Sequence, residues 1–76
     1  MRLHLGGHLN FFGEGKQPWQ EIALSSVTPL IEIINRLGIP AAEIALTVVN
    51  GEMADLQSAQ VGNEDEVQIY PPVDGG

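Results

Sequence analysis

The chain has 76 residues, with ten acidic side chains against three basic ones, a net charge of -7 and no cysteine. A chain of this length forms one domain with a modest core, in which a catalytic cleft that excludes water is hard to build. The negative charge repels phosphate backbones, so we expect no nucleic-acid binding. It suits a basic protein partner, or else serves solubility alone. Without cysteine the chain has no disulfide, no thiolate metal site and no thiol nucleophile.

No stretch of the sequence approaches the apolar length of a membrane span, which is about 18 residues or more. Residues 1–5 lack the long apolar run of a signal peptide. We therefore expect a cytoplasmic protein that contacts no membrane.

Two strands are predicted in the first third of the chain. Apolar and polar residues alternate over residues 1–5, as they do in a half-buried strand. Gly6-Gly7 marks a bulge or the end of that strand, and residues 8–12 either resume it or begin a loop. A second alternating stretch at residues 20–24 completes an N-terminal hairpin.

The clearest element is a helix over residues 29–37. Thr28 is its expected N-cap, and Pro29 then takes the first helical position, where a missing N–H costs nothing. Gly38 stands where a left-handed C-terminal cap is expected. One apolar stripe follows the i, i+3, i+4, i+7 spacing and comprises Leu30, Ile33, Ile34 and Leu37.

Three more strands are predicted, at residues 45–49, 52–54 and 67–70. Asn50-Gly51 suits a type I′ turn between the first two, because both central residues of that turn need positive φ. The resulting order predicts an α+β roll, in which one helix covers a mixed sheet of four to five strands. The core should contain Leu3, Leu24, Ile34, Val48, Val67 and Ile69.

The end of the chain carries the strongest functional signal. Pro71-Pro72 ends the last strand, because proline cannot donate to a ladder. We therefore expect a domain at residues 1–70 and a flexible tail at residues 71–76, which can reach roughly 20 Å. Glycine has no Cβ, so the terminal Gly75-Gly76 can thread a narrow channel. The alternative is an ordinary frayed terminus.

A family resemblance joins these features. The run Val67-Gln68-Ile69-Tyr70-Pro71-Pro72-Val73-Asp74-Gly75-Gly76 resembles the end of the molybdopterin-synthase small subunits, which close with a strand, Pro-Pro-Val, one variable residue and Gly-Gly. Residues 62–67 look like the Gly-Asp-Glu-Val turn of that family. Val48-Val49-Asn50-Gly51 is similar to the strand and hairpin of the thiamine-pathway sulfur carriers. The segment before Pro18 departs from this pattern and is similar to stand-alone ubiquitin-like domains.

The resemblance implies a ubiquitin-like β-grasp fold and a sulfur-carrier cycle in molybdopterin biosynthesis. An activating adenylyltransferase would use ATP to adenylate the terminal carboxylate, and a sulfur donor would convert the adenylate to a thiocarboxylate. A large synthase subunit, or another acceptor protein, would then take the sulfur. The reactive residue would be Gly76, in a carrier that binds no cofactor and is not itself an enzyme. The channel-threading tail would comprise Gly75, Asp74, Val73, Pro72 and Pro71, with Tyr70 as a candidate partner contact.

Three other functions stay open. The first is a thiamine-pathway sulfur carrier, although Pro-Pro-Val favours the molybdopterin pathway. The second is a protein modifier joined through Gly76 to lysines of its targets. The third is a non-covalent adaptor domain, in which the Gly-Gly end is incidental.

Two groups of side chains have the residue types of a metal site, but the spacing of neither group favours metal binding. His4 and His8 would lie about 13 Å apart on one face of a strand, which is too far for one ion, so we expect surface histidines. Residues 64–66 are consecutive acids on a turn and point different ways. We expect them to be a solvated turn and not a hard-cation site.

The aromatic residues Phe11, Phe12 and Trp19 lie in the segment that departs from the family pattern. We expect them to plug the ends of a small core. The alternative is an exposed docking patch, because aromatic side chains are enriched at interface centres.

Overall fold

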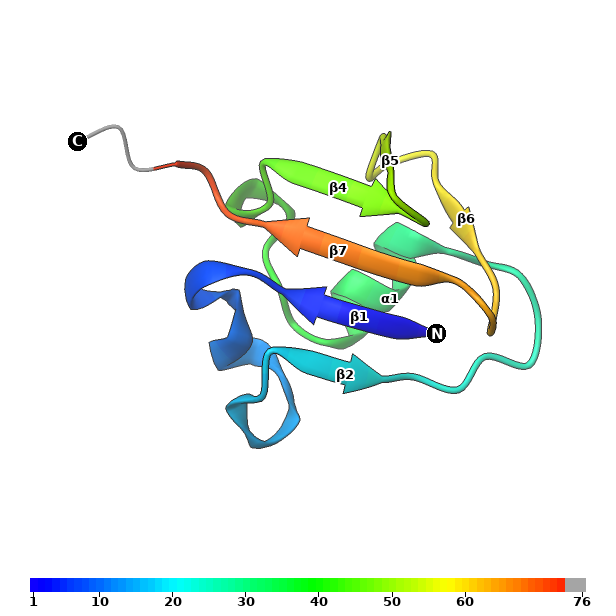
Figure 1. Ribbon diagram of the computed structural model, residues 1–76, viewed down its shortest axis with the longest axis horizontal. Helices are drawn as coiled ribbons and strands as arrows, with labels where there is room; N and C mark the ends of the chain where they lie inside the picture. Colours follow the sequence, from blue (N-terminus) through cyan, green and yellow to red (C-terminus); the bar gives the residue numbers. More distant parts are fainter. Residues whose placement is uncertain (74–76) are drawn as a thin grey trace.

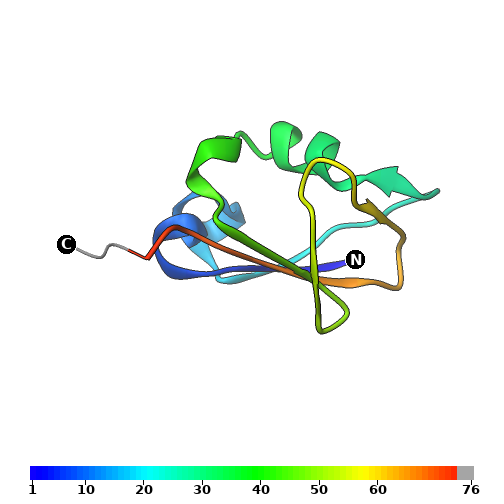
Figure 2. The ribbon, with the colours of Figure 1, turned by 90° about the horizontal axis from the view of Figure 1, so that it is seen from above.

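The computed structural model describes residues 1–73 and shows one five-stranded mixed sheet with a helix across one face (Figures 1 and 2). The sheet order is β2-β1-β7-β4-β5. Its strands are β1 Arg2–Leu5, β2 Trp19–Glu21, β4 Leu46–Val49, β5 Glu52–Ala54 and β7 Glu66–Tyr70. The helix is α1 Leu30–Arg36. This confirms the expected α+β class and the β-grasp roll.

Several short elements complete the fold. The strands β3 Thr28–Pro29 and β6 Gln60–Val61 pair with each other in a small second ladder. Three 3₁₀ turns lie at Gly7–Phe12, Glu14–Lys16 and Ala41–Glu43. The first two form the connection between β1 and β2, which the sequence left open between strand and loop.

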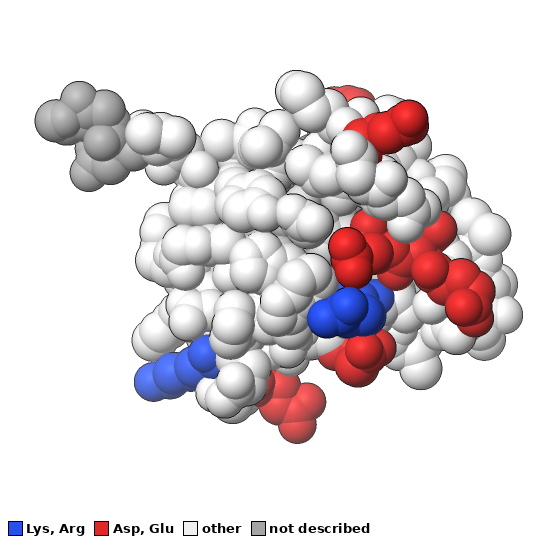
Figure 3. Space-filling model, in the orientation of Figure 1, with Lys and Arg blue, Asp and Glu red and all other residues white. Residues whose placement is uncertain are grey.

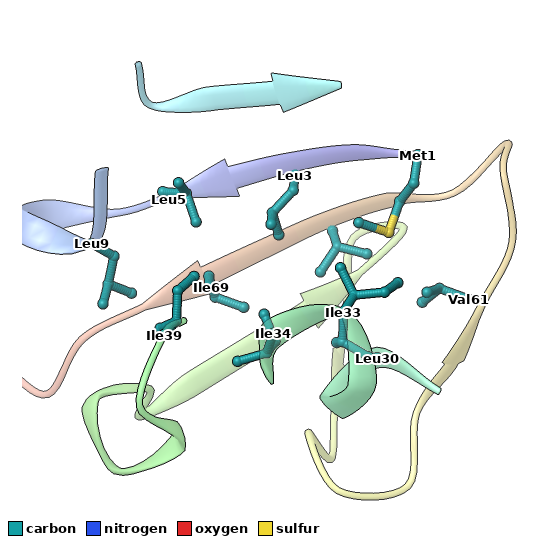
Figure 4. Close-up of a cluster of buried hydrophobic side chains, with 11 residues drawn as sticks. Met1, Leu3, Leu5, Leu9, Leu30, Ile33, Ile34, Ile39, Val61 and Ile69 are labelled. Atoms are coloured by element: carbon teal, nitrogen blue, oxygen red, sulfur yellow. The ribbon is translucent and has the colours of Figure 1, made fainter. Parts of the chain in front are cut away.

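The centre of the sheet is the parallel pair of β1 and β7, flanked by antiparallel strands. Its register sets Leu3 beside Val67 and Leu5 beside Ile69, so these four side chains share the face under α1. A parallel pair needs a long crossover connection, and the segment that contains α1 is part of it. Figure 4 shows the resulting core, in which Ile33 and Ile34 face the sheet residues.

The buried core comprises Met1, Leu3, Leu5, Leu9, Leu30, Ile33, Ile34, Ile39, Val61, Val67 and Ile69. Four of the six expected members are confirmed, and two are wrong. Leu24 lies past the end of β2 and is only half-buried. Val48 pairs with Gln68 and Met53 on the sheet face away from the helix, and its neighbour Thr47 points into the core instead. An unbroken run of apolar and β-branched residues does not reveal which alternate positions face inward.

The prediction for the N-terminal cap of α1 was wrong, whereas the prediction for its C-terminal cap was right. Thr28 is not the N-cap: it belongs to β3, and its hydroxyl donates to the Ser26 carbonyl at 2.9 Å. Pro29 is the N-cap residue, with no side-chain cap, and the first helical N–H, that of Leu30, donates to the Ala59 carbonyl at 2.9 Å. Pairing with β6 thus replaces the expected cap.

The C-terminal cap is confirmed. Gly38 has φ 77°, and its N–H donates to the Asn35 carbonyl at 3.0 Å. The next N–H, that of Ile39, reaches back to the Ile34 carbonyl at 3.2 Å. These two bonds form a Schellman motif, which turns the chain so that Ile39 enters the core.

Two turns are locked together at the end of the sheet where β7 begins. Asn50 and Gly51 have φ 52° and 85°, as the type I′ turn requires. The Asn50 side chain donates to Asp65 Oδ1 and accepts from the Glu66 N–H, both at 2.9 Å. The other oxygen of Asp65 accepts from the Gly62 N–H at 2.7 Å. The middle acid of the acidic turn is therefore part of the framework.

Candidate functional site

The tail begins at a firmly held strand end. The Ile69 carbonyl accepts from the Gly6 N–H, and the Tyr70 carbonyl accepts from the Ala45 N–H, both at 2.8 Å. Beyond Tyr70 the exposure of the chain rises steeply. Pro71 is half-buried, Pro72 is exposed, and Val73 is 93% exposed. The predicted reactive and threading residues Asp74, Gly75 and Gly76 lie outside the described residues, so their roles stay predictions.

One face of the sheet is uncovered and borders this exit. The registers align one residue from each strand in a row across it, in the order Trp19, His4, Gln68, Val48 and Met53. A second row pairs Tyr70 with Leu46. The tail therefore leaves from one border of an open, apolar and aromatic sheet face.

Charge is unevenly distributed over this face. Figure 3 shows a surface without acidic or basic side chains over the parts of β4 and β7 that lie toward the tail, whereas acidic groups gather where β7 begins. There Arg2 lies 3.8 Å from Glu21 and 3.3 Å from Glu66, and its guanidinium lies 4.3 Å from the centre of the Trp19 ring. Glu21 and Glu66 thus compensate the charge of Arg2, and the surface over β4 and β7 toward the tail carries no acidic or basic side chain.

The His4 ring packs at a tilt against two aromatic rings. Its ring centre is 4.7 Å from that of Trp19 and 5.7 Å from that of Tyr70. Its Nδ1 is buried and has no hydrogen-bond partner among residues 1–73. Tyr70, the candidate partner contact, is thus half-buried against His4, and its hydroxyl donates to the Gln68 side chain.

The histidines and the acids do not come together as metal ligands. His8 is exposed as expected, and its Nε2 lies 3.1 Å from a carboxylate oxygen of Glu43. His4 is packed in the sheet face and is not a free surface residue. Within residues 1–73 no three histidine, cysteine or acidic side chains form a group that could hold a metal ion.

The aromatic residues divide between core and surface. Phe12 packs against the core, as expected, while Leu9 takes the fully buried position of that segment. The expectation was wrong for Phe11, which is 66% exposed, and for Trp19, which is 39% exposed. Phe11 meets Phe12 edge-on at 6.0 Å, and the Lys16 ammonium lies 5.1 Å from the centre of its ring.

Sequence reasoning missed one part of the site, the Gly6-Gly7 pair. It follows β1 and lies directly beside Tyr70 and Pro71, where the tail begins. The sequence shows the two adjacent glycines, but no residue close in sequence explains why both positions are glycine. Its meaning depends on residues more than sixty positions away, which the sequence alone does not pair.

The helices of residues 1–73 include none long and apolar enough to cross a bilayer. Among protein families, the model described as Mut7-C ubiquitin matches residues 2–74. No curated protein matches the chain. The expected ubiquitin-like relationship is therefore confirmed, whereas the narrower likeness to molybdopterin-synthase small subunits stays a prediction. Because the match spans nearly the whole sequence, the chain belongs to the Mut7-C ubiquitin family.

Proposed function

We propose that this chain is a sulfur carrier for molybdopterin biosynthesis, activated at Gly76 by a partner adenylyltransferase and then thiocarboxylated. The observation that supports the proposal best is the way β7 ends. Ile69 is fully buried, and four residues later Val73 is 93% exposed. The chain thus leaves a rigid sheet within a few residues, in a sequence that resembles the tails of known carriers. The carrier would supply the end of the chain, and its partners would supply the catalysis.

The chemistry fits a chain of this composition. The terminal carboxylate would attack the α-phosphate of ATP and release pyrophosphate, because hydroxide is too poor a leaving group for direct substitution. Hydrosulfide supplied by the sulfur source would then attack the acyl carbon of the adenylate, expel AMP and lose its proton, which leaves a thiocarboxylate. Since the sequence has no cysteine, a thioacid at Gly76 is the form in which this chain could carry reduced sulfur covalently.

The uncovered sheet face supports a partner that holds the domain as well as the tail. Residues 71–76 extend to roughly 20 Å, so an enzyme that takes the terminus must stand close to Tyr70. The neutral side of the sheet face lies within that reach and exposes Leu46 and Met53 by 37% and 81%. An apolar surface on the activating enzyme or on the large synthase subunit would suit this face.

A non-covalent adaptor is the second candidate. The exposed Trp19, Leu46 and Met53 favour it, because their contacts would not depend on the tail. A protein modifier or a thiamine-pathway carrier would share the adenylation step. The modifier would differ from our proposal in forming an isopeptide bond between Gly76 and a lysine amine without sulfur transfer, and the thiamine-pathway carrier would differ only in the pathway that receives the sulfur.

Intact mass tests the proposal. The purified chain is first weighed to verify that it ends at Gly76, and is then incubated with ATP, a matching activating enzyme and a sulfur source. We expect a gain equal to the replacement of one oxygen by sulfur, followed by transfer to the large synthase subunit. An unchanged mass with an active enzyme would contradict the carrier function and leave the adaptor. Stable conjugates with lysines would replace the proposal by the modifier.

A further inference from the structure

The glycine pair that follows β1 lies against the root of the tail. A Cβ at Gly6 would clash with Cδ1 of Tyr70 and would lie 3.0 Å from the Ile69 carbonyl oxygen. A Cβ at Gly7 would lie 2.9 Å from Cγ of Pro71. Figures 1 and 2 both show the turn after β1 beside the chain that leaves β7. No other residue type fits here without a shift of the neighbouring chain.

Crowding at a glycine is not confined to this pair, since a Cβ at Gly13 would lie 2.7 Å from Cδ1 of Leu5, but Gly38 and Gly51 show a different use of glycine. Gly38 and Gly51 have φ 77° and 85°, yet a Cβ at either would meet nothing within 4 Å. Those two glycines serve only the backbone conformation of a turn. Gly6 is the reverse case, because its φ of -72° suits any residue and only the close approach of Tyr70 demands glycine. Gly7 combines both demands, because it has φ 52° and a Cβ there would lie too close to the Pro71 ring.

Within residues 1–73, the last backbone hydrogen bond along the tail is made at Tyr70. The carbonyls of Ile69 and Tyr70 each accept a backbone N–H, whereas Pro71 has no N–H to donate. Pro71 has no ladder hydrogen bond of its own, and the missing Cβ of Gly7 leaves room for its ring, one residue before the exposed Pro72. A small change at Gly7 should redirect the exit of the chain while leaving the sheet intact.

We infer that Gly7, supported by Gly6, is a positioning residue that sets the direction in which the tail leaves the domain. The effect of Gly7 on the rate of activation rests on the proposed function, in which the terminal carboxylate must reach ATP in a defined geometry. A misplacement of about 1 Å can cost on the order of 100-fold in rate. The effect on tail direction does not depend on that function.

The test uses Gly7→Ala, with Gly15→Ala as the matched control. Gly15 also has positive φ, 64°, but its nearest neighbour for a Cβ is Cγ of Gln17 at an ordinary 3.7 Å. Both variants carry the same kind of backbone strain, and only the first pushes on Pro71. A third variant, Gly7→Ala with Pro71→Ala, removes the ring atom that the new methyl would strike and should restore the wild-type direction.

Energy transfer measures the direction. The chain has one tryptophan, Trp19, and no cysteine, so a single dye on Val73→Cys reports the distance between sheet and tail. A dye on Met53→Cys serves as a reference within the sheet. We expect Gly7→Ala to change the transfer efficiency to position 73 but not to position 53, and Gly15→Ala to change neither. Equal transfer to position 73 in Gly7→Ala and wild type would overturn the inference.

Activation is then measured as ATP–pyrophosphate exchange on the unlabelled chains. We expect Gly7→Ala to lower kcat/KM by up to about 100-fold and the added Pro71→Ala to recover most of the loss. If wild type is not activated at all while Gly7→Ala still redirects the tail, the positioning role stands and the proposed function falls. If Gly7→Ala does not fold, the double variant decides. A folded double variant with wild-type transfer to position 73 supports the inference, and a double variant that also fails to fold overturns it, because the strain would then not come from Pro71.

Discussion

The two ends of the central strand pair are held by different means. At the end where β7 begins, two turns are cross-linked by the side chains of Asn50 and Asp65, and the N-terminal ammonium donates to the carbonyls of Ile22 and Asn63 at 2.8 and 2.6 Å. At the end where β7 finishes, the last fixed points are two backbone hydrogen bonds, and Gly7 leaves room beside them for the Pro71 ring. Polar side chains stabilise the end where β7 begins. At the other end, Gly6 and Gly7 have no side chains and so allow Tyr70 and Pro71 to lie close to them. The first end gives a rigid platform, and the second releases the chain in a set direction.

The largest expected effect is a loss of activation without a loss of stability. One alanine added after Gly76 should abolish ATP-dependent activation, because the added residue shifts the carboxylate away from the reactive distance of about 3–3.5 Å. The free energy of unfolding should stay unchanged, since the addition lies beyond the core. Pyrophosphate exchange and a urea titration on the same sample measure both. An extended chain that is activated as well as wild type would refute the carrier function.

A loss of stability without a loss of activation is expected from a change at Asn50, at the end where β7 begins. Asn50→Gly removes the side-chain bonds to Asp65 and Glu66 but keeps the positive φ that the turn needs. The loss in unfolding free energy should be about 1–3 kcal/mol in a urea titration. Activation of the folded protein should match wild type. A selective loss of activation would show that the two ends are coupled, and the contrast drawn above would fail.

Helix α1 lies between these ends and offers a test of the core. Ile34 is fully buried, so Ile34→Ala should cost about 2–5 kcal/mol in a denaturant titration. Ile31, next to the apolar stripe and half-buried, is the matched control. Its alanine variant should cost clearly less. Equal losses would mean that the helix packs with a broader face than its burial indicates.

The exposed sheet face can be tested with a matched pair of surface variants. Met53 is 81% exposed on this face, and Val27 is 68% exposed before β3. Neither Met53→Glu nor Val27→Glu should change stability by more than about 0.5 kcal/mol. If the activating enzyme covers the sheet face, Met53→Glu should raise its KM about 5- to 10-fold, because a buried interface anchor contributes more than about 1 kcal/mol. Equal KM values for both variants would contradict docking on this face.

Features with a local cause were predictable from sequence. Gly38 and Asn50-Gly51 form their turns because positive φ is a property of single residues. The end of β7 at Tyr70 follows from the two prolines after it. The exposed course of Pro72 and Val73 follows from the same pair.

Features that depend on distant pairing were not predictable. Thr28 resembles an N-cap, but pairing with Val61 draws it into a strand. The inward face of β4 is chosen by its register with β7, which sets Thr47 beside the buried Ile69. The close approach of Gly7 and Pro71 joins residues at opposite ends of the sequence. Local patterns therefore predicted most of the elements and the start of the tail. They did not predict that the Gly6-Gly7 turn lies beside Tyr70 and Pro71.

The smallest expected effect is a pH dependence at the platform end. The hydrogen bond from Asn50 and then that from the Gly62 N–H hold the pKa of Asp65 below its usual value, with a minor contribution from the N-terminal ammonium. A carboxyl group whose pKa is lowered by folding stabilises the protein above its unfolded pKa, about 3.9, and this stabilisation is lost as pH falls through the lower folded pKa. Wild type should therefore lose stability between about pH 5 and about pH 2 more steeply than Asp65→Asn, which cannot ionise.

Asp65→Asn should also be less stable at neutral pH, because an amide offers one acceptor oxygen where the carboxylate uses two. Urea titrations at several pH values measure both differences. The remaining acids titrate in both proteins, so only the difference between the two curves reports Asp65. Parallel curves would mean that the carboxylate contributes no more than an amide would. The platform end would then be held by Asn50 and the backbone alone, and the contrast between the two ends would reduce to one side chain.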